Sequence, residues 1–183
     1  MKGPTLATIG VLLMAAAVPS HAQGPILFFG GGVTIPLSDY KNVDGAKTGW
    51  MATAGFGVPV GGKGLMVGAE GYFGSNKHEE PPVGDKTNLY GASGFLTYRF
   101  GPTTKAGVYL IGSAGAMKHD YRSTAFPNDQ GGDFEFAWSG GAGVDIPVGA
   151  KSSIWLESRY FQRGDTRFIP IFVGVSIGIG SGS

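Results

Sequence analysis

Apolar and polar residues alternate with period two along most of the chain after residue 23. No window of this region keeps an apolar period of 3.6 residues, and the many glycines would each weaken a helix by ~1 kcal/mol. The alternation therefore predicts short β-strands. Eight are predicted, at residues 26–36, 48–59, 64–74, 87–100, 106–118, 134–147, 152–162 and 168–179. Each has about the length that a tilted strand needs to cross a bilayer, ~9–11 residues.

The connections between these strands alternate in length. Long connections cover residues 37–47, 75–86 and 119–133, short ones cover 60–63, 101–105 and 148–151, and a modest one covers 163–167. This rhythm is typical of an up-and-down membrane barrel, whose short turns face the periplasm and whose long loops face outside. The predicted fold class is all-β, an eight-stranded antiparallel up-and-down transmembrane β-barrel. Pro170, early in the last strand, predicts an irregular sheet at that point.

Charged residues within the predicted strands indicate which face of each strand meets lipid and which faces the lumen. A membrane barrel is apolar outside and more polar within, and a charge facing lipid at the midplane costs ~2–4 kcal/mol. The last strand carries an uninterrupted apolar face that includes Ile171 and Val173, and six charged side chains in other strands lie opposite an apolar face. We therefore predict that an ion-pair network fills the barrel lumen. Its predicted members are Glu70, Arg99, Glu135, Asp145, Glu157 and Arg159.

An eight-stranded barrel has an interior just wide enough for its own side chains, so no open pore is expected. Buried charges persist only when they are paired, and Glu157 with Arg159 is the expected centre of the network. A proton or small-cation path through the same groups is the alternative interpretation.

Aromatic residues gather near the ends of the predicted strands. This distribution resembles the aromatic girdles that mark the two membrane–water interfaces of a barrel. The predicted girdle consists of Trp50, Phe73, Tyr98, Phe100, Phe134, Phe136 and Tyr160.

The first residues have the pattern of a secretory signal peptide. Lys2 precedes an apolar run over residues 6–18, which leads to a small-residue site ending at Ala22. That run is shorter than the ~20 residues that a helix needs to cross a bilayer, which argues against a permanent anchor. A buried helix of the folded domain is the alternative. We predict that residues 1–22 are a signal peptide, cleaved after Ala22, and that residues 23–183 are one outer-membrane β-barrel domain.

Composition excludes several classes of protein. The chain has 14 basic and 13 acidic residues, so loss of Lys2 leaves equal numbers, and no basic excess points to nucleic acid. It has no cysteine, so an exported fold must be held together without disulfides. Glycine is abundant, at 34 residues, but it is mixed with aromatic and β-branched residues that disordered chains lack.

Several stretches resemble a known family. Residues 140–149 (GGAGVDIPVG) and 155–160 (WLESRY) are similar to the sixth and seventh strands of the small outer-membrane β-barrel family, which includes OmpA-like, OmpX-like and opacity-like barrels. Residues 173–179 resemble the last strand of that family, and residues 30–39 resemble its first strand and loop. The resemblance implies the outer membrane of a Gram-negative bacterium. It says little about activity, because this fold carries many functions.

The resemblance also implies partners. They are outer-membrane lipid, lipopolysaccharide and, during biogenesis, the outer-membrane assembly machinery. Members of the family usually end on an aromatic residue, whereas Ile179 fills that position here and residues 180–183 follow it. A closed barrel needs no partner to satisfy its edges, so a monomer is predicted. No pattern in the sequence indicates a cofactor.

Two histidines of the predicted domain, His78 and His119, are candidate catalytic residues. Barrels that modify lipopolysaccharide need a nucleophile near a histidine and a carboxylate. His119 precedes Asp120 and lies near Ser123, while His78 precedes two glutamates, and both histidines are predicted in or at outer loops. Such neighbours are common in polar loops, so no catalytic residue is predicted and the protein is not expected to be an enzyme.

Acidic residues of the outer loops are weak candidates for Ca²⁺ ligands, because their spacing does not form a recognisable site. They are Glu79 and Glu80 beside His78, and Asp129 with Asp133. No metal site is predicted.

Three functions remain open from the sequence. The first is a structural or surface-interaction barrel that displays long polar loops outside the cell. The second is an outer-membrane enzyme that modifies the lipid of lipopolysaccharide. The third is an exported lipocalin-like barrel with a bound ligand, which would need an apolar interior and a polar exterior. The charge distribution contradicts the third, and the first is favoured over the second because the sequence shows no catalytic pattern.

Overall fold

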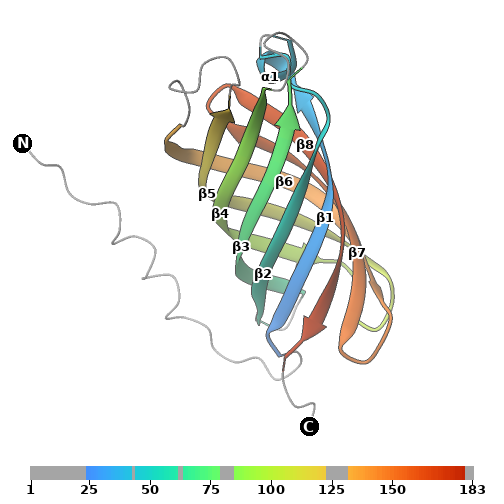
Figure 1. Cartoon of the computed structure of the whole chain (residues 1–183). Helices are drawn as coiled ribbons and strands as arrows, with labels where there is room; N and C mark the ends of the chain where they lie inside the picture. The colour runs from blue at the N-terminus through green and yellow to red at the C-terminus, as the bar shows by residue number, and fades with distance from the viewer. Residues whose placement is uncertain (1–23, 43, 62–63, 79–84, 123–131, 180–183) are drawn as a thin grey trace, which may run out of the picture.

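A computed structural model describes residues 24–42, 44–61, 64–78, 85–122 and 132–179. The predicted signal peptide, residues 1–22, lies outside the described residues. Eight antiparallel strands form one closed barrel in sequence order, with β1 paired to both β2 and β8 (Figure 1). The strands are β1 (Ile26–Leu37), β2 (Gly49–Val60), β3 (Leu65–Lys77), β4 (Lys86–Arg99), β5 (Gly107–Arg122), β6 (Phe134–Pro147), β7 (Ser152–Arg163) and β8 (Thr166–Gly178). This confirms the predicted fold class.

The strand ends differ from the prediction mainly at one end of the barrel. β3 continues to Lys77 and β5 to Arg122, so His119, predicted in a loop, lies within a strand. Ladder pairing explains the extension, because Lys77 pairs with Lys86, which in turn pairs with Arg122.

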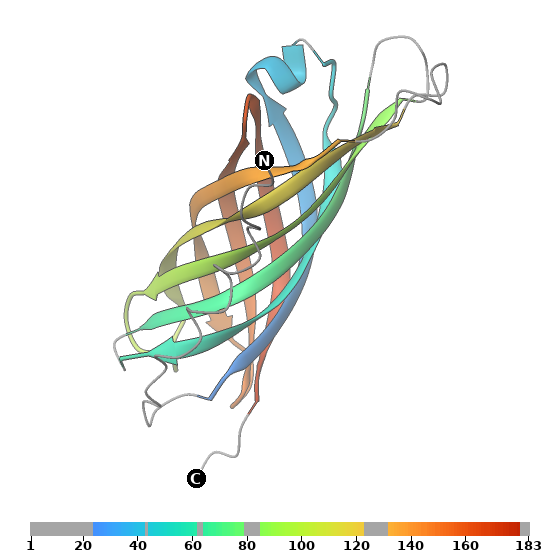
Figure 2. The same cartoon turned by 90° about the vertical axis from the view of Figure 1, so that its left-hand side faces the viewer.

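A short helix, α1 (Ser38–Asn42), follows β1 and was not predicted. It lies at the end of the barrel opposite to the start of β1 and the end of β8 (Figure 2). No helix among the described residues is long and apolar enough to cross a membrane.

The sheet is irregular at Pro170, as predicted. In the ladder between β7 and β8, Ser158 pairs with Ile171 and pairing resumes only at Phe161 with Phe168. Proline has no backbone N–H to donate, so a break in the ladder is expected opposite it. On its other side Pro170 keeps its register with Thr34 of β1, and the barrel stays closed there.

The outer surface of the barrel is apolar on every strand. Leu156 and Val173, which pair with each other near the middle of β7 and β8, are 55% and 56% exposed. Charged residues of opposite parity are buried, with Glu157 4% and Arg159 3% exposed. The structure therefore has the inside-out polarity that was predicted for a membrane barrel. A lipocalin-like barrel would show the reverse.

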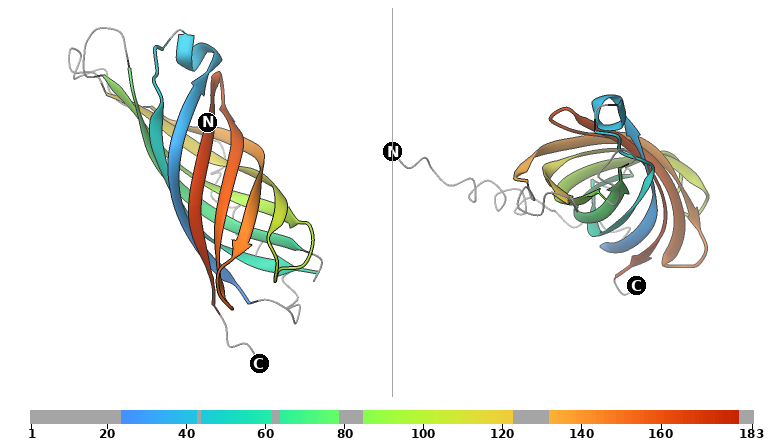
Figure 3. Two further views of the ribbon diagram at one scale, coloured as in Figure 1. Left: turned by 90° about the vertical axis from the view of Figure 1, so that its right-hand side faces the viewer. Right: turned by 45° about the horizontal axis from the view of Figure 1, so that its top comes forward.

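Aromatic rings fill part of the interior, and glycines make room for them. The indole of Trp155 occupies the space inside Gly30 and Gly174, where an added Cβ would lie 2.5 and 2.2 Å from its ring carbons. Phe28 meets Trp155 and Phe95 edge-on at centroid distances of 6.3 and 5.6 Å. Glycine in these strands thus permits close approach of a ring to the backbone. The tilted strands that surround this core are seen from two directions in Figure 3.

Candidate functional site

The centre of the lumen holds a charged cluster around Arg159 of β7. Its Nη1 and Nη2 donate to the two carboxylate oxygens of Glu70 on β3, at 2.5 and 2.9 Å. Its Nε donates to Glu157 Oε1, at 2.5 Å. All three residues are at least nine-tenths buried. One guanidinium thus bridges two carboxylates that approach from opposite walls of the barrel, with two parallel bonds to Glu70, the arrangement that suits arginine best.

Neutral side chains complete the cluster. Ser93 of β4 donates to Glu70 at 2.9 Å, and Tyr109 of β5 donates to Glu157 at 2.9 Å. The guanidinium carbon of Arg159 lies 6.0 Å from the centroid of the Phe161 ring. Hydrogen bonds therefore join β3, β4, β5 and β7 across the lumen. We call Glu70, Ser93, Tyr109, Glu157 and Arg159 the lumen cluster.

Two other members of the predicted network form a separate pair near the short-turn end. Arg99 Nε donates to Asp145 Oδ2 at 3.3 Å. Arg99 also donates to the carbonyl oxygens of Pro102 at 2.7 Å and Lys105 at 2.5 Å. Asp145 accepts from Ser153 as well. Arg99 thus fastens the turn between β4 and β5, while Asp145 links β6 to the start of β7.

The sixth predicted member lies at the opposite end of the barrel. Glu135, near the start of β6, is paired with Arg163 of β7 at 3.0 Å, and its side chain is 53% exposed. Arg163 also donates to the carbonyls of Met117 and Asp133, each at 3.1 Å. The structure therefore divides the six predicted residues among three groups at different heights, and only Glu70, Glu157 and Arg159 meet.

Sequence reasoning missed Tyr109 and Ser93, which share the lumen cluster, and Arg163. The sequence does not show that Tyr109 faces the lumen, because both faces of the fifth strand are mostly apolar or glycine. Arg163 was assigned to a loop, whereas it is the last residue of β7.

Tyr40 of α1 is inserted into the mouth of the barrel at the α1 end. It is 2% exposed, and its ring stacks on His119 with centroids 5.9 Å apart. The rings of His78 and Phe168 each lie 6.5 Å from it. Burial raises the pKa of the Tyr40 phenol above its ordinary value. The mouth is thus covered by an uncharged aromatic side chain.

The two histidines form no catalytic arrangement with their described neighbours. His119 Nε2 lies 3.2 Å from Met117 Sδ, while the neighbouring Asp120 pairs with Arg122. His78 bonds through Nδ1 to the carbonyl of Asp44 and through Nε2 to the Thr87 hydroxyl, at 2.8 Å. Ser123, Glu79, Glu80 and Asp129 lie outside the described residues. Within the described part of the chain, no three His, Cys, Asp or Glu side chains gather to hold a metal ion.

The aromatic residues predicted as a girdle lie on the outer surface near both ends of the strands. Trp50 and Phe73 are 48% and 39% exposed, and their rings meet edge-on at 5.1 Å. Tyr98 and Phe100, at the other end, pair at 4.9 Å. Phe134 and Phe136 are more than half exposed, and Tyr160 lies 5.6 Å from Trp138.

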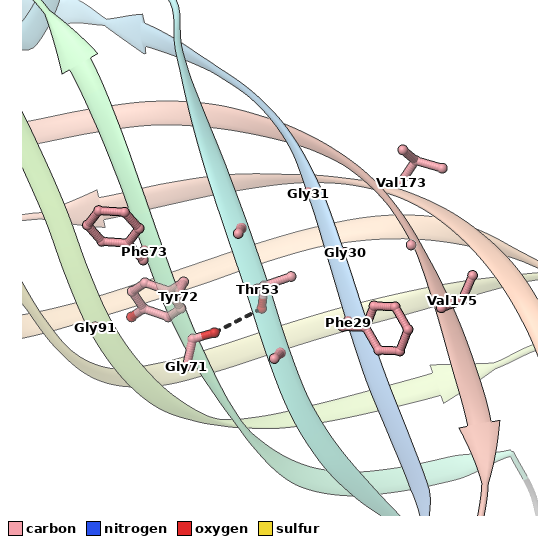
Figure 4. A pocket seen from close by; sticks show the side chains of 13 residues that line it. Phe29, Gly30, Gly31, Thr53, Gly71, Tyr72, Phe73, Gly91, Val173 and Val175 are labelled. Atoms are coloured by element: carbon pink, nitrogen blue, oxygen red, sulfur yellow. Dashed lines mark hydrogen bonds between the residues drawn. The ribbon is translucent and has the colours of Figure 1, made fainter.

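A shallow depression of about 820 Å³ lies on the outer wall across β8, β1, β2, β3 and β4 (Figure 4). Small residues line it, among them Gly31, Ala52 and Gly71, together with Phe29 and Phe73. A hydrogen bond from Thr53 Oγ1 to the Gly71 carbonyl, at 3.2 Å, joins two of its strands. The depression belongs to the apolar surface and contains no charged side chain.

Comparisons with known proteins identify relatives of this fold. The model of the outer membrane protein β-barrel domain matches residues 8–177. No curated protein sequence matches. Neisserial surface protein A (NspA) superposes with a TM-score of 0.67 at 14% identity, covering 85% of this chain and 96% of that one.

Two further barrels superpose over most of their length. Ail, the attachment invasion locus protein of Yersinia pestis, gives a TM-score of 0.56 at 14% identity, covering 86% of this chain and all of the other. The N-terminal barrel domain of Pseudomonas aeruginosa OprF gives 0.56 at 12% identity, covering 86% and 98%. At these identities the likeness shows a shared fold.

Proposed function

Because this chain belongs to the outer membrane protein β-barrel family, we propose that it is a closed, non-conducting barrel whose outer end interacts with molecules at the cell surface. The observation that carries the proposal is the filled lumen. The lumen cluster crosses the middle of the barrel, and Trp155 with Phe28 and Phe95 occupies further interior space. Eight strands leave room for little else.

The covered outer mouth supports the same conclusion. Tyr40 lies against His78, His119 and Phe168, so packed rings occupy the lumen at the α1 end of the barrel. A barrel that transports no solute acts through its surface. The longer connections of this barrel all lie at the α1 end, which we assign to the cell exterior.

The relatives support a surface role by their names. NspA is named a surface protein, and Ail is named for attachment and invasion and has also been solved with the heparin analogue sucrose octasulfate. We propose no catalytic role, because neither His78 nor His119 faces a described carboxylate and hydroxyl in the order that nucleophilic catalysis needs.

Single cysteines test both closure and orientation, since the natural chain has none. Three variants are made in separate proteins: Lys41→Cys in α1, Ser113→Cys in the lumen wall and Thr103→Cys in the turn between β4 and β5. Intact cells are treated with a membrane-impermeant maleimide. We expect the Lys41→Cys variant to be labelled, and the Thr103→Cys variant to be labelled only after the outer membrane is opened.

The Ser113→Cys variant reports on the lumen. Ser113 is 9% exposed and lies 2.7 Å from Ser139 across the β5–β6 pair, both oxygens facing inward. We expect no labelling on either side of the membrane until the protein is unfolded by heating. Rapid labelling of the folded variant would show a water-filled lumen and would contradict closure. Labelling of Thr103→Cys on intact cells would reverse the orientation.

A further inference from the structure

The side chain of Tyr40 occupies a site in the barrel mouth that is built by residues of the strands. We propose that this site binds a free catechol-type molecule, a planar ring with two neighbouring hydroxyl groups, and that Tyr40 is its built-in, exchangeable occupant. The inference goes beyond the proposed function and shares with it only the placement of the α1 end at the cell exterior. We call the residues around Tyr40 the ring site: Asn76, His78, Thr87, His119 and Phe168.

Three rings enclose Tyr40 from different sides. The imidazole of His119 stacks on it, with an interplanar angle of 29° and centroids 5.9 Å apart. His78 meets it at 74° and Phe168 at 59°, each with centroids 6.5 Å apart. Phe168 is itself held by stacking on Phe161, at 5.2 Å. Because β3, β5 and β8 position these rings, the slot for a planar ring belongs to the barrel and not to α1.

A buried amide beside the slot has an acceptor that Tyr40 does not use. Asn76 is 0% exposed, and its Nδ2 donates to Thr34 Oγ1 at 2.8 Å and to the Lys47 carbonyl at 2.7 Å. Its Oδ1 accepts no hydrogen bond from any residue that the structure describes. An unpaired buried acceptor destabilises the folded state. A ligand that brings a donor to this oxygen would remove that penalty.

Asn76 lies close to the hydroxyl end of the slot. It pairs directly with Thr87, and directly opposed residues have Cβ atoms about 4.5–5.5 Å apart. The Tyr40 hydroxyl approaches Thr87, whose own hydroxyl is bonded to His78 Nε2 at 2.8 Å. Within the described residues, the Tyr40 hydroxyl makes no hydrogen bond of normal geometry. A ring with two neighbouring hydroxyl groups can serve both Thr87 and Asn76, which the single hydroxyl of tyrosine does not.

The segment that carries Tyr40 has a left-handed residue at each end. Ser38, the first residue of α1, has a φ of +49°, and Gly45 has a φ of +65°. This conformation is unfavourable for serine, because its Cβ comes too close to the following carbonyl oxygen, so the docked form carries local strain. Beyond Gly45, the N–H of Lys47 donates to the Lys77 carbonyl at 2.8 Å. Lifting α1 between these two points therefore leaves the strands paired.

Exchange of the occupant does not open the barrel. Leu89, Met117 and Phe172 belong to the same buried cluster as Tyr40 and are each at most 2% exposed, and the lumen cluster still crosses the middle. An incoming ring replaces one aromatic ring by another and leaves the lumen filled. A tyrosine of another protein would have to bring its own backbone to the place that α1 covers, whereas a free molecule needs only the slot.

Displacement of α1 in the otherwise unaltered chain is the direct test. The Lys41→Cys and Thr103→Cys proteins each carry a trifluoromethyl label on the exposed cysteine and are studied in nanodiscs by ¹⁹F NMR. The probes are 4-methylcatechol, p-cresol and toluene, which share one ring and one methyl group but have two, one and no hydroxyl groups. We expect 4-methylcatechol to shift the α1 label and to leave the turn label unchanged. p-Cresol should need about tenfold higher concentrations, since a satisfied buried acceptor contributes about that factor, and toluene should shift neither label.

Variants of the occupant separate exchange from simple filling of a cavity. Tyr40→Ala empties the slot, while Tyr40→Phe, the matched control, keeps a ring in it. Binding is measured by calorimetry against protein-free nanodiscs. We expect Tyr40→Ala to bind 4-methylcatechol about 100-fold more tightly than wild type, because a site that is open roughly 1% of the time loses affinity by that factor. Tyr40→Phe should bind as weakly as wild type.

A further variant tests the role of the amide. Adding Asn76→Leu to Tyr40→Ala should abolish the preference, about tenfold, for 4-methylcatechol over p-cresol. If the variants do not fold, the labelled Lys41→Cys protein still decides the proposal, because its ring site is intact.

Three results would overturn the proposal. An α1 label that does not respond up to the highest soluble concentration of 4-methylcatechol would show that Tyr40 is a fixed plug. Equal responses to all three compounds would show partition of apolar molecules without recognition by the ring site. Equal responses of the α1 and turn labels would show a general effect on the membrane. The cysteine-labelling test of closure uses no ligand, so either proposal can fail alone.

Discussion

Replacing Arg159 by methionine should lower the free energy of unfolding by about 3–5 kcal/mol, the largest loss expected from any single change in the lumen. Removing one partner of a buried ion pair leaves charge without compensation. In this barrel the change leaves two carboxylates, Glu70 and Glu157, without their cation, and each is at most 4% exposed. The two carboxylates would also face each other without the cation between them.

Urea unfolding in phosphatidylcholine vesicles, followed by tryptophan fluorescence, measures this loss. The matched variant is Glu70→Gln/Glu157→Gln/Arg159→Met, which removes all the charges together. Because replacing a whole buried ion pair is often nearly neutral, we expect it to recover most of the lost stability. An Arg159→Met barrel within 1 kcal/mol of wild type would show that the lumen cluster does not hold the strands together.

Replacing Leu156 by arginine should cost about 2–4 kcal/mol, because the side chain lies near the middle of β7 on the lipid-facing wall. Leu156 is 55% exposed and pairs with Val144 and Val173, both apolar. In a water-soluble barrel the same change would place a charge at an exposed position and cost almost nothing. The size of the loss therefore depends on the surrounding solvent being lipid.

Val148→Arg is the control for depth. Val148 and Leu156 are similarly exposed, at 58% and 55%. Val148, however, lies in the short turn after β6. A charge near the interface costs ~0–1 kcal/mol. Both variants are compared with wild type in the same vesicles by urea unfolding. Equal, small losses at the two positions would argue against a bilayer around β7.

The fold was predictable because its main determinant is local. The alternation of apolar side chains along a strand decides which face meets lipid. In β8 the alternating residues Ile171, Val173, Val175 and Ile177 show this face without reference to any partner strand. Turn positions were equally visible from glycine and proline. The extension of β5 to Arg122 was not, since polar residues beyond the membrane give no apolar alternation and ladder pairing alone continues the strand.

The lumen cluster was predictable only in part. Parity placed Glu70, Glu157 and Arg159 on the inner face, but which of them meet depends on the stagger of eight strands around the barrel. Glu70 and Arg159 lie on β3 and β7, which are not neighbours. The insertion of Tyr40 into the mouth depends on the path of a connection, and no periodic pattern in the sequence encodes that path.

Tryptophan quenching by brominated phosphatidylcholine tests most directly whether apolar side chains face lipid and the interior is sealed. The three tryptophans differ in place: Trp50 and Trp138 are 48% and 42% exposed on the outer wall, and Trp155 is 6% exposed inside. Single-tryptophan proteins are made by replacing the other two with phenylalanine and folded into vesicles with bromine on the acyl chains. We expect strong quenching of Trp138 and little quenching of Trp155. Equal quenching of the two, or none of either, would contradict the account.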